Sequence, residues 1–148
     1  MFTTRPLQAS DFVALAHYRN TLAPEESPVT AEALQAQEAV SVRERNTGLI
    51  IALAEETITA TVRYVEARSK EDGPGTYWLY FSALPAYRAV ELFDDLYQGV
   101  LKMLTTKAAT SVQGMAREDD ATLLEFYQRQ HFHEKLRLST DYKQFIEP

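Results

Sequence analysis

The chain has 148 residues, of which 45% are hydrophobic, a length and composition that suit a single domain over residues 1–148. Its net charge of −6 argues against nucleic acid as a partner, because that binding depends on basic side chains that neutralise phosphates. The absence of cysteine excludes disulfides, thiolate nucleophiles and cysteine-ligated metals. The start MFTTRPLQ lacks the apolar run of a signal peptide or membrane anchor. Together these features lead us to expect a cytoplasmic protein.

The chain begins with a pattern that predicts a short strand and a helix. Residues 2–7 favour a strand that Pro6 limits near its end, and Ser10 or Asp11 is placed to begin a helix that ends near Leu22. The candidate buried residues of this helix are Phe12, Val13, Leu15, Ala16 and Tyr18.

A second helix and a pair of strands follow. Thr30 is placed to cap a helix over residues 31–45, whose apolar side chains are mostly small, so we expect it to lie close against its support. Gly48 is expected to take a positive φ after this helix. The apolar stretch 49–54 and the Thr- and Val-rich stretch 57–67 predict two antiparallel strands.

The middle of the chain predicts a central strand and the longest helix. After a charged loop over residues 68–75, the strand 76–84 carries aromatic side chains on both faces, which is typical of a strand buried on both sides. The helix over residues 86–107 has an apolar stripe at helical spacing. The stripe consists of Phe93, Leu96, Tyr97, Val100 and Leu104.

The last third predicts strand 111–117, a helix that begins at Asp119 or Asp120, and closing strands over residues 132–139 and 142–146. The order of strands and helices predicts an α/β (α+β sandwich) fold, with a mixed sheet of about six or seven strands and about four helices.

This order, and two motifs within it, resemble those of the GNAT N-acetyltransferase superfamily. Residues 115–132 (MAREDDATLLEFYQRQHF) are similar to the family pattern N-x-x-A-x-x-F-Y-x-x-x-G-F, with Asp120, Leu123 and His131 in the Asn, Ala and Gly places. Residues 85–93 (PAYRAVELF) are similar to P-x-Y-R-G-x-G-x-G/A. The stretches ESPVTAEA and LRLSTDYKQF also resemble the N-terminal half of tandem GNAT proteins.

The resemblance implies an acetyl-CoA donor site at the end of the central strand and the start of the longest helix, whose free N–H groups would receive the pyrophosphate. The residues implied to bind acetyl-CoA are Ala83, Arg88, Ala89, Val90, Glu91, Leu92, Phe93 and Asp120. Three of them, Ala89, Glu91 and Phe93, replace glycines. A carboxylate at Glu91 about 6 Å from a phosphate would cost about 3 kcal/mol at an effective dielectric near 20. Two interpretations stay open: a working pyrophosphate loop, or an acidic first turn that satisfies the helix without a ligand.

The resemblance also implies direct acyl transfer, with Tyr127 as the acid that assists the departing thiolate; the alternative is a core tyrosine. Neither face of strand 76–84 carries a carboxylate that could serve as the base. Glu66 and Glu118 are candidates acting through water, or else surface charges. His131 and His133 lack an evident third ligand, so we expect no metal.

The sequence therefore predicts an N-acetyltransferase that transfers an acyl group from acetyl-CoA, or another acyl-CoA, to a small-molecule or peptide amine. The alternative is a degenerate, non-catalytic GNAT-like module that binds a partner or forms a homodimer.

Overall fold

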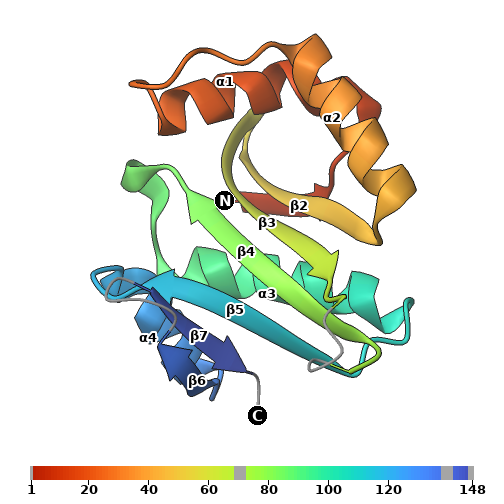
Figure 1. Cartoon of the computed structure of the whole chain (residues 1–148). Helices are drawn as coiled ribbons and strands as arrows, with labels where there is room; N and C mark the ends of the chain where they lie inside the picture. Colours follow the sequence, from red (N-terminus) through yellow and green to blue (C-terminus); the bar gives the residue numbers. More distant parts are fainter. Residues whose placement is uncertain (1, 69–72, 138–141, 147–148) are drawn as a thin grey trace.

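The computed structural model describes residues 2–68, 73–137 and 142–146, and Figure 1 shows its arrangement. Its strands form one seven-stranded sheet in the order β1-β2-β3-β4-β5-β7-β6. The strands are β1 (Phe2–Pro6), β2 (Thr47–Ala54), β3 (Thr57–Glu66), β4 (Thr76–Ala83), β5 (Ser111–Arg117), β6 (His133–Arg137) and β7 (Tyr142–Ile146). The α-helices are α1 (Phe12–Leu22), α2 (Ala31–Glu44), α3 (Val90–Thr105) and α4 (Ala121–Arg129), and short 3-10 turns cover Ala9–Asp11 and Pro85–Tyr87.

Two layers of helix sandwich the sheet, with α1 and α2 on one face and α3 and α4 on the other (Figure 1). Strand β2 is buried on both faces, which explains its continuous apolar run. Ile50 and Ala52 join the core under α3, whereas Leu49, Ile51 and Leu53 join the core under α1. The predicted stripe of α3 is fully buried, and β4 lies at the centre of the sheet, as its aromatic side chains predicted.

The pairing of β4 with β5 is parallel and incomplete, whereas the other pairings in the sheet are antiparallel. Residues 76–79 of β4 pair with residues 111–114 of β5, and the pairing stops there. Figure 1 shows the two strands close together at one end and apart at the other. The result is a wedge between the carboxyl ends of two neighbouring parallel strands.

Three predictions about the first half of the chain were wrong. Val13 is 75% exposed because it lies on the outer face of α1. Leu34 is the buried residue of α2, so this helix does not lie close against the sheet; cavities lie beneath it. Gly48 belongs to β2 and is not among the residues with positive φ; a side chain there would overlap the ring of Tyr64.

The ends of α2 and α4 agree with the sequence. Thr30 Oγ1 accepts a hydrogen bond from Ala33 N at 3.1 Å, so it caps α2. Helix α4 ends at Arg129, and His131, two residues further on, has a φ of 63°. Two backbone bonds, His131 N to Gln128 O and Phe132 N to Tyr127 O, close the last turn. The predicted loop 68–75 and strand 132–139 each extend partly outside the described residues, at 69–72 and 138–139.

Candidate functional site

The wedge between β4 and β5 opens beside the N-termini of two helices. Helix α3 begins after β4 and helix α4 begins after β5, so both helices start at the carboxyl ends of the diverging strands. Ligands of open α/β sheets bind in this position, where neighbouring strands separate and helix N-termini offer unpaired N–H groups.

The start of α3 is open to an incoming group. Its N-cap residue, Ala89, has an extended backbone (φ −154°, ψ 145°) and no side-chain cap, and the first helical bond runs from Phe93 N to Ala89 O. The side chain of Glu91 is 80% exposed and its Oε1 lies 3.9 Å from Arg129 Nη1. The carboxylate therefore faces solvent beside a cation, where its repulsion of a phosphate is screened.

Arg88 reaches from this loop to the start of α4. Its Nη2 donates to both oxygens of Asp120, at 2.5 and 2.6 Å, and its guanidinium lies 5.3 Å from the centre of the Phe93 ring. Asp120 Oδ1 also accepts from Leu123 N at 3.2 Å, so the same carboxylate caps α4. The Arg88–Asp120 pair thus links the N-termini of the two helices.

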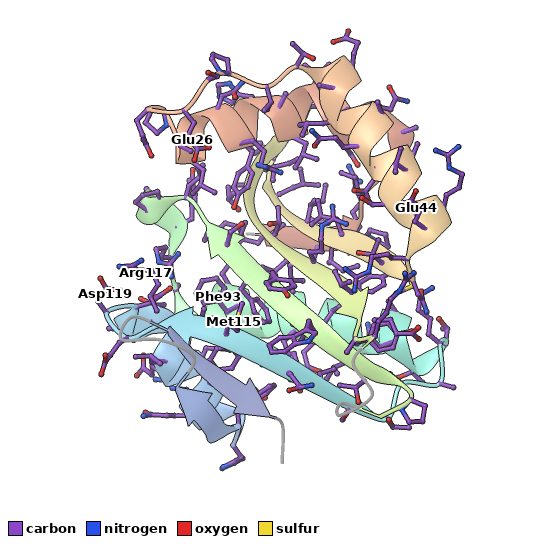
Figure 2. All side chains as sticks on the ribbon, viewed as in Figure 1. Glu26, Glu44, Phe93, Met115, Arg117 and Asp119 are labelled. Carbon is purple, nitrogen blue, oxygen red and sulfur yellow. The ribbon has the colours of Figure 1, made fainter. Side chains whose placement is uncertain are left out.

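Aromatic rings pack where the strands separate. Phe81 of β4 lies 5.8 Å from Phe93, 5.0 Å from Phe126 and 6.3 Å from Tyr127, measured between ring centres. Figure 2 labels Phe93 and Met115 in this region. The predicted donor-site residues Ala83, Val90, Leu92 and Phe93 are buried, so a ligand would meet their backbone rather than their side chains.

Tyr127 lies at the apex of the wedge. Its hydroxyl donates to the carbonyl oxygen of Met115 at 3.2 Å, and its ring is fully buried against Gly114, where an added methyl would overlap the hydroxyl. Burial raises the pKa of Tyr127 well above that of a free tyrosine, and the negative charge of Asp120 adds to this shift. The phenol therefore keeps its proton at every pH near neutrality.

The two candidate bases lie at opposite ends of the wedge. Glu66 pairs with Tyr77 at the closed end. It lies four residues along β3 from Val62, the partner of Phe81, so the Cα atoms of Glu66 and Val62 are about 13 Å apart. Glu118 lies in the exposed turn after β5, at the open end. Within the described residues, no group of three or more His, Asp or Glu side chains is placed to hold a metal ion.

The opposite face of β4 carries polar groups that the sequence did not single out. Ser82 Oγ lies 2.6 Å from Tyr18 Oη and 2.8 Å from Thr61 Oγ1, which makes a cluster of three hydroxyls. These residues line a cavity of about 440 Å³ between the sheet and helices α1 and α2. A glycine inside strand β5 was a signal for the close approach of Tyr127, but no sequence pattern predicted the hydroxyl cluster.

The chain is matched by no family model and by no curated protein, but solved structures share its fold. An acetyltransferase of the GNAT family from Streptococcus pneumoniae superimposes with a TM-score of 0.78 at 12% identity, covering 100% of this chain and 98% of that one. A ribosomal-protein-alanine N-acetyltransferase from Brucella melitensis gives 0.77 at 14% identity and 98% of both chains.

A third structure is similar over its whole length and contains a ligand. The PaiA N-acetyltransferase from Thermoplasma acidophilum, in complex with coenzyme A, gives a TM-score of 0.74 at 12% identity, covering 100% of this chain and 99% of that one. Among the described residues of this chain, no helix is both long and apolar enough to cross a bilayer.

Proposed function

The chain has the GNAT fold, and we propose that it is an N-acyltransferase that uses acetyl-CoA or another acyl-CoA as donor. The observation that carries the proposal is the wedge between β4 and β5, with the uncapped N-terminus of α3 at its open end. Unpaired backbone donors and a positive dipole end suit a diphosphate. In this proposal the pyrophosphate lies on the first turn of α3 and the pantetheine arm enters the wedge.

Three features of the described residues fit this donor. Residues 80–83 of β4 have no β5 partner, so alternate backbone N–H and C=O groups face the wedge and are available to the amides of pantetheine. Glu91 points away into solvent, which removes most of the repulsion that its charge would cause. Arg88 lies at the open end and supplies a cation that can move from Asp120 to a phosphate.

The reaction needs no enzyme nucleophile. The neutral amine of the acceptor attacks the carbonyl carbon of the thioester, a C–N bond forms as the C–S bond breaks, the proton of the amine passes to water, and coenzyme A leaves as its thiolate. Tyr127, whose pKa lies above that of a thiol, would stabilise the developing thiolate by donating a hydrogen bond rather than by giving up its proton. Its donation to Met115 O would then be exchanged for donation to the sulfur.

A specific observation favours a second function, that of a non-catalytic module. The rings of Phe93, Phe126 and Tyr127 are fully buried around the wedge, and Arg88 already has a carboxylate partner. A chain that had lost its donor would be stabilised by such contacts. This alternative predicts partner binding or a stable homodimer, without any response to acyl-CoA.

An acyl-transfer assay with the Tyr127→Phe variant tests the proposed chemistry. Release of free thiol from acetyl-CoA is followed with a panel of small amines and peptides. We expect the variant to lower kcat by about 10- to 100-fold with little change in the affinity for acetyl-CoA, because the hydrogen bond acts on charge that develops in the transition state. An unchanged kcat would remove Tyr127 from the mechanism.

A further inference from the structure

Helices α1 and α2 cover one face of the sheet (Figure 1), and the cavity beneath them has walls of three kinds. One wall holds the ion pair of Glu38 and Arg63, another holds the hydroxyl cluster around Ser82, and a third is apolar with Tyr80 at its edge; Arg19, Gln37 and Ser41 also line the cavity. The apolar wall consists of Leu15, Leu22, Leu34 and Leu49. A small molecule with a charged group, a second polar group and an apolar side chain would match all three.

The ion pair joins a helix to the sheet across this space. Arg63 Nη2 lies 2.6 Å from Glu38 Oε1, and Arg63 Nη1 also donates to Thr47 Oγ1 at 3.2 Å. The side chains are 29% and 17% exposed, so both charges are largely withdrawn from water. Because a pair in this position contributes little net stability, its place on a cavity wall suggests a role in binding. Glu38 holds the guanidinium through both terminal nitrogens, at 2.6 and 3.4 Å, so a ligand carboxylate would be met by the remaining N–H groups of the five that an arginine carries.

The hydroxyl cluster is next to this ion pair, because its member Thr61 lies two residues before Arg63 on β3. Thr61 and Arg63 project from the same face of β3, with their Cα atoms about 7 Å apart. Ser82, which links Thr61 to Tyr18, is the β4 neighbour of Phe81, and Phe81 reaches the wedge. A group held at Ser82 is therefore the part of a cavity ligand that lies nearest the proposed donor site.

The charge of the cavity is opposite to that of the chain. Its walls carry Arg19, Arg63 and a single carboxylate, Glu38, whereas the chain has a net charge of −6. The positive charges of Arg88 and Arg19 also act on the Tyr18 hydroxyl, where they oppose the burial that raises its pKa. Local positive charge favours a ligand carboxylate and disfavours a protonated amine. It therefore favours the anionic, neutral-amine form of an amino acid, which is also the form that can attack a thioester.

We propose that this cavity binds a free amino acid with an apolar or aromatic side chain, its carboxylate on Arg63, its amine at Ser82 and its side chain on the leucine wall beside Tyr80. The role of this amino acid as the acyl acceptor rests on the proposed function. The binding itself depends on the cavity alone.

The test is binding without acyl-CoA, measured from the thermal unfolding midpoint against ligand concentration. The four probes are L-phenylalanine, 3-phenylpropionate (no amine), L-phenylalaninamide (no carboxylate) and 2-phenylethylamine (neither α-carboxylate nor amide). We expect L-phenylalanine and 3-phenylpropionate to bind about tenfold or more tightly than the two compounds without a carboxylate. Equal binding of the acid and the amide, or no shift with any probe at about 10 mM, would overturn the proposal.

Two variants locate the interaction. The double variant Glu38→Gln/Arg63→Gln removes both charges together, which avoids an unpaired carboxylate, and is expected to bring the acid-to-amide ratio close to one. Ser82→Ala is expected to weaken L-phenylalanine by about threefold or more and to leave 3-phenylpropionate unchanged, because only the first has an amine. Val13→Ala, on the exposed face of α1, is the matched control and should leave all four affinities unchanged. A double variant that still prefers the acid would contradict the assignment to Arg63.

The two proposals can fail separately. If L-phenylalanine binds and acetyl-CoA does not, the cavity proposal stands and the proposed acyltransferase function falls. If acetyl-CoA binds and its acyl group is transferred only to amines without a carboxylate, the donor site stands and the amino acid in the cavity is not the acyl acceptor.

Discussion

Asp120 has two roles at the residue scale, because its carboxylate caps α4 and holds Arg88. Asparagine also caps helices well but carries no charge. We therefore expect Asp120→Asn to free Arg88 and to tighten acetyl-CoA binding by about three- to tenfold, with a loss of stability below about 1 kcal/mol. Calorimetry and urea unfolding measure the two effects.

The control for this change is Asp120→Ala, which also loses the cap and should cost about 1 kcal/mol of stability. Glu91→Gln provides a second comparison. Because the carboxylate of Glu91 is exposed, its removal should change the affinity for acetyl-CoA much less than Asp120→Asn does. Weaker binding of acetyl-CoA to a folded Asp120→Asn protein would mean that Arg88 does not serve the donor.

Gly114 sets the packing between two elements, β5 and α4. A Cβ at this position would lie 2.8 Å from Tyr127 Cζ, and the buried ring has no room to move. We expect Gly114→Ala to destabilise the fold by about 1–3 kcal/mol, as overpacked cores do. The midpoint of urea unfolding, at constant slope, measures this loss.

Gly99→Ala in α3 is the matched control for this substitution. Its Cβ would lie 3.3 Å from Ile50 Cγ2, a tight contact that the gain in helix propensity of about 1 kcal/mol offsets. The stability should therefore stay within about 1 kcal/mol of the parent protein. Equal losses in the two variants would show that Tyr127 is not held as tightly as its burial indicates.

The elements themselves could be predicted from the sequence because their signals are local. Thr30 caps α2, the stripe of α3 is buried, and β2 is apolar on both faces, as periodicity and capping chemistry predicted. Gly48 and α2 were misread because their environment comes from distant residues. The ring of Tyr64 requires the glycine, and α2 lies over cavities, so Ala33, Ala36 and Ala39 are exposed.

The candidate site could be predicted only in part. Two motifs placed Arg88, Asp120 and Tyr127 near one another, but the direction of a side chain such as Glu91 does not follow from a motif. The hydroxyl cluster joins residues 21 and 64 positions apart, so no local pattern could reveal it. Long-range contacts of this kind appear only once the sheet is assembled.

The stability of the whole molecule should fall at both extremes of pH. Hydrogen bonds from Arg5 at 2.6 and 2.8 Å, and from Gln8 N, hold the pKa of Asp11 below its usual range. A lowered native pKa gives stability that is present above about pH 4 and is lost as the pH falls through the native value. Asp11→Asn should flatten this acid limb in urea unfolding from pH 7 to 3. Arg117 also lowers the pKa of Asp119, but water screens this exposed pair, so Asp119→Asn should flatten the limb much less.

At alkaline pH the loss of stability comes from groups whose pKa is raised, rather than lowered, by folding. Burial raises the pKa of Tyr18 and Tyr127, so these phenols keep their protons in the folded state while the unfolded chain ionises above about pH 10. The unfolded state then binds fewer protons, and stability falls as the pH rises further. A flat profile up to pH 11 would contradict the burial of these hydroxyls.

A calorimetric titration of the chain with acetyl-CoA tests the central claim most directly, namely that the β4–β5 wedge and the start of α3 form a donor site. We expect saturable binding of one molecule per chain, with an affinity that falls as salt is raised because the pyrophosphate contributes. The Asp120→Asn variant should bind more tightly under the same conditions. No heat of binding at millimolar acetyl-CoA, for either protein, would contradict the account and leave the non-catalytic module as the function of this fold.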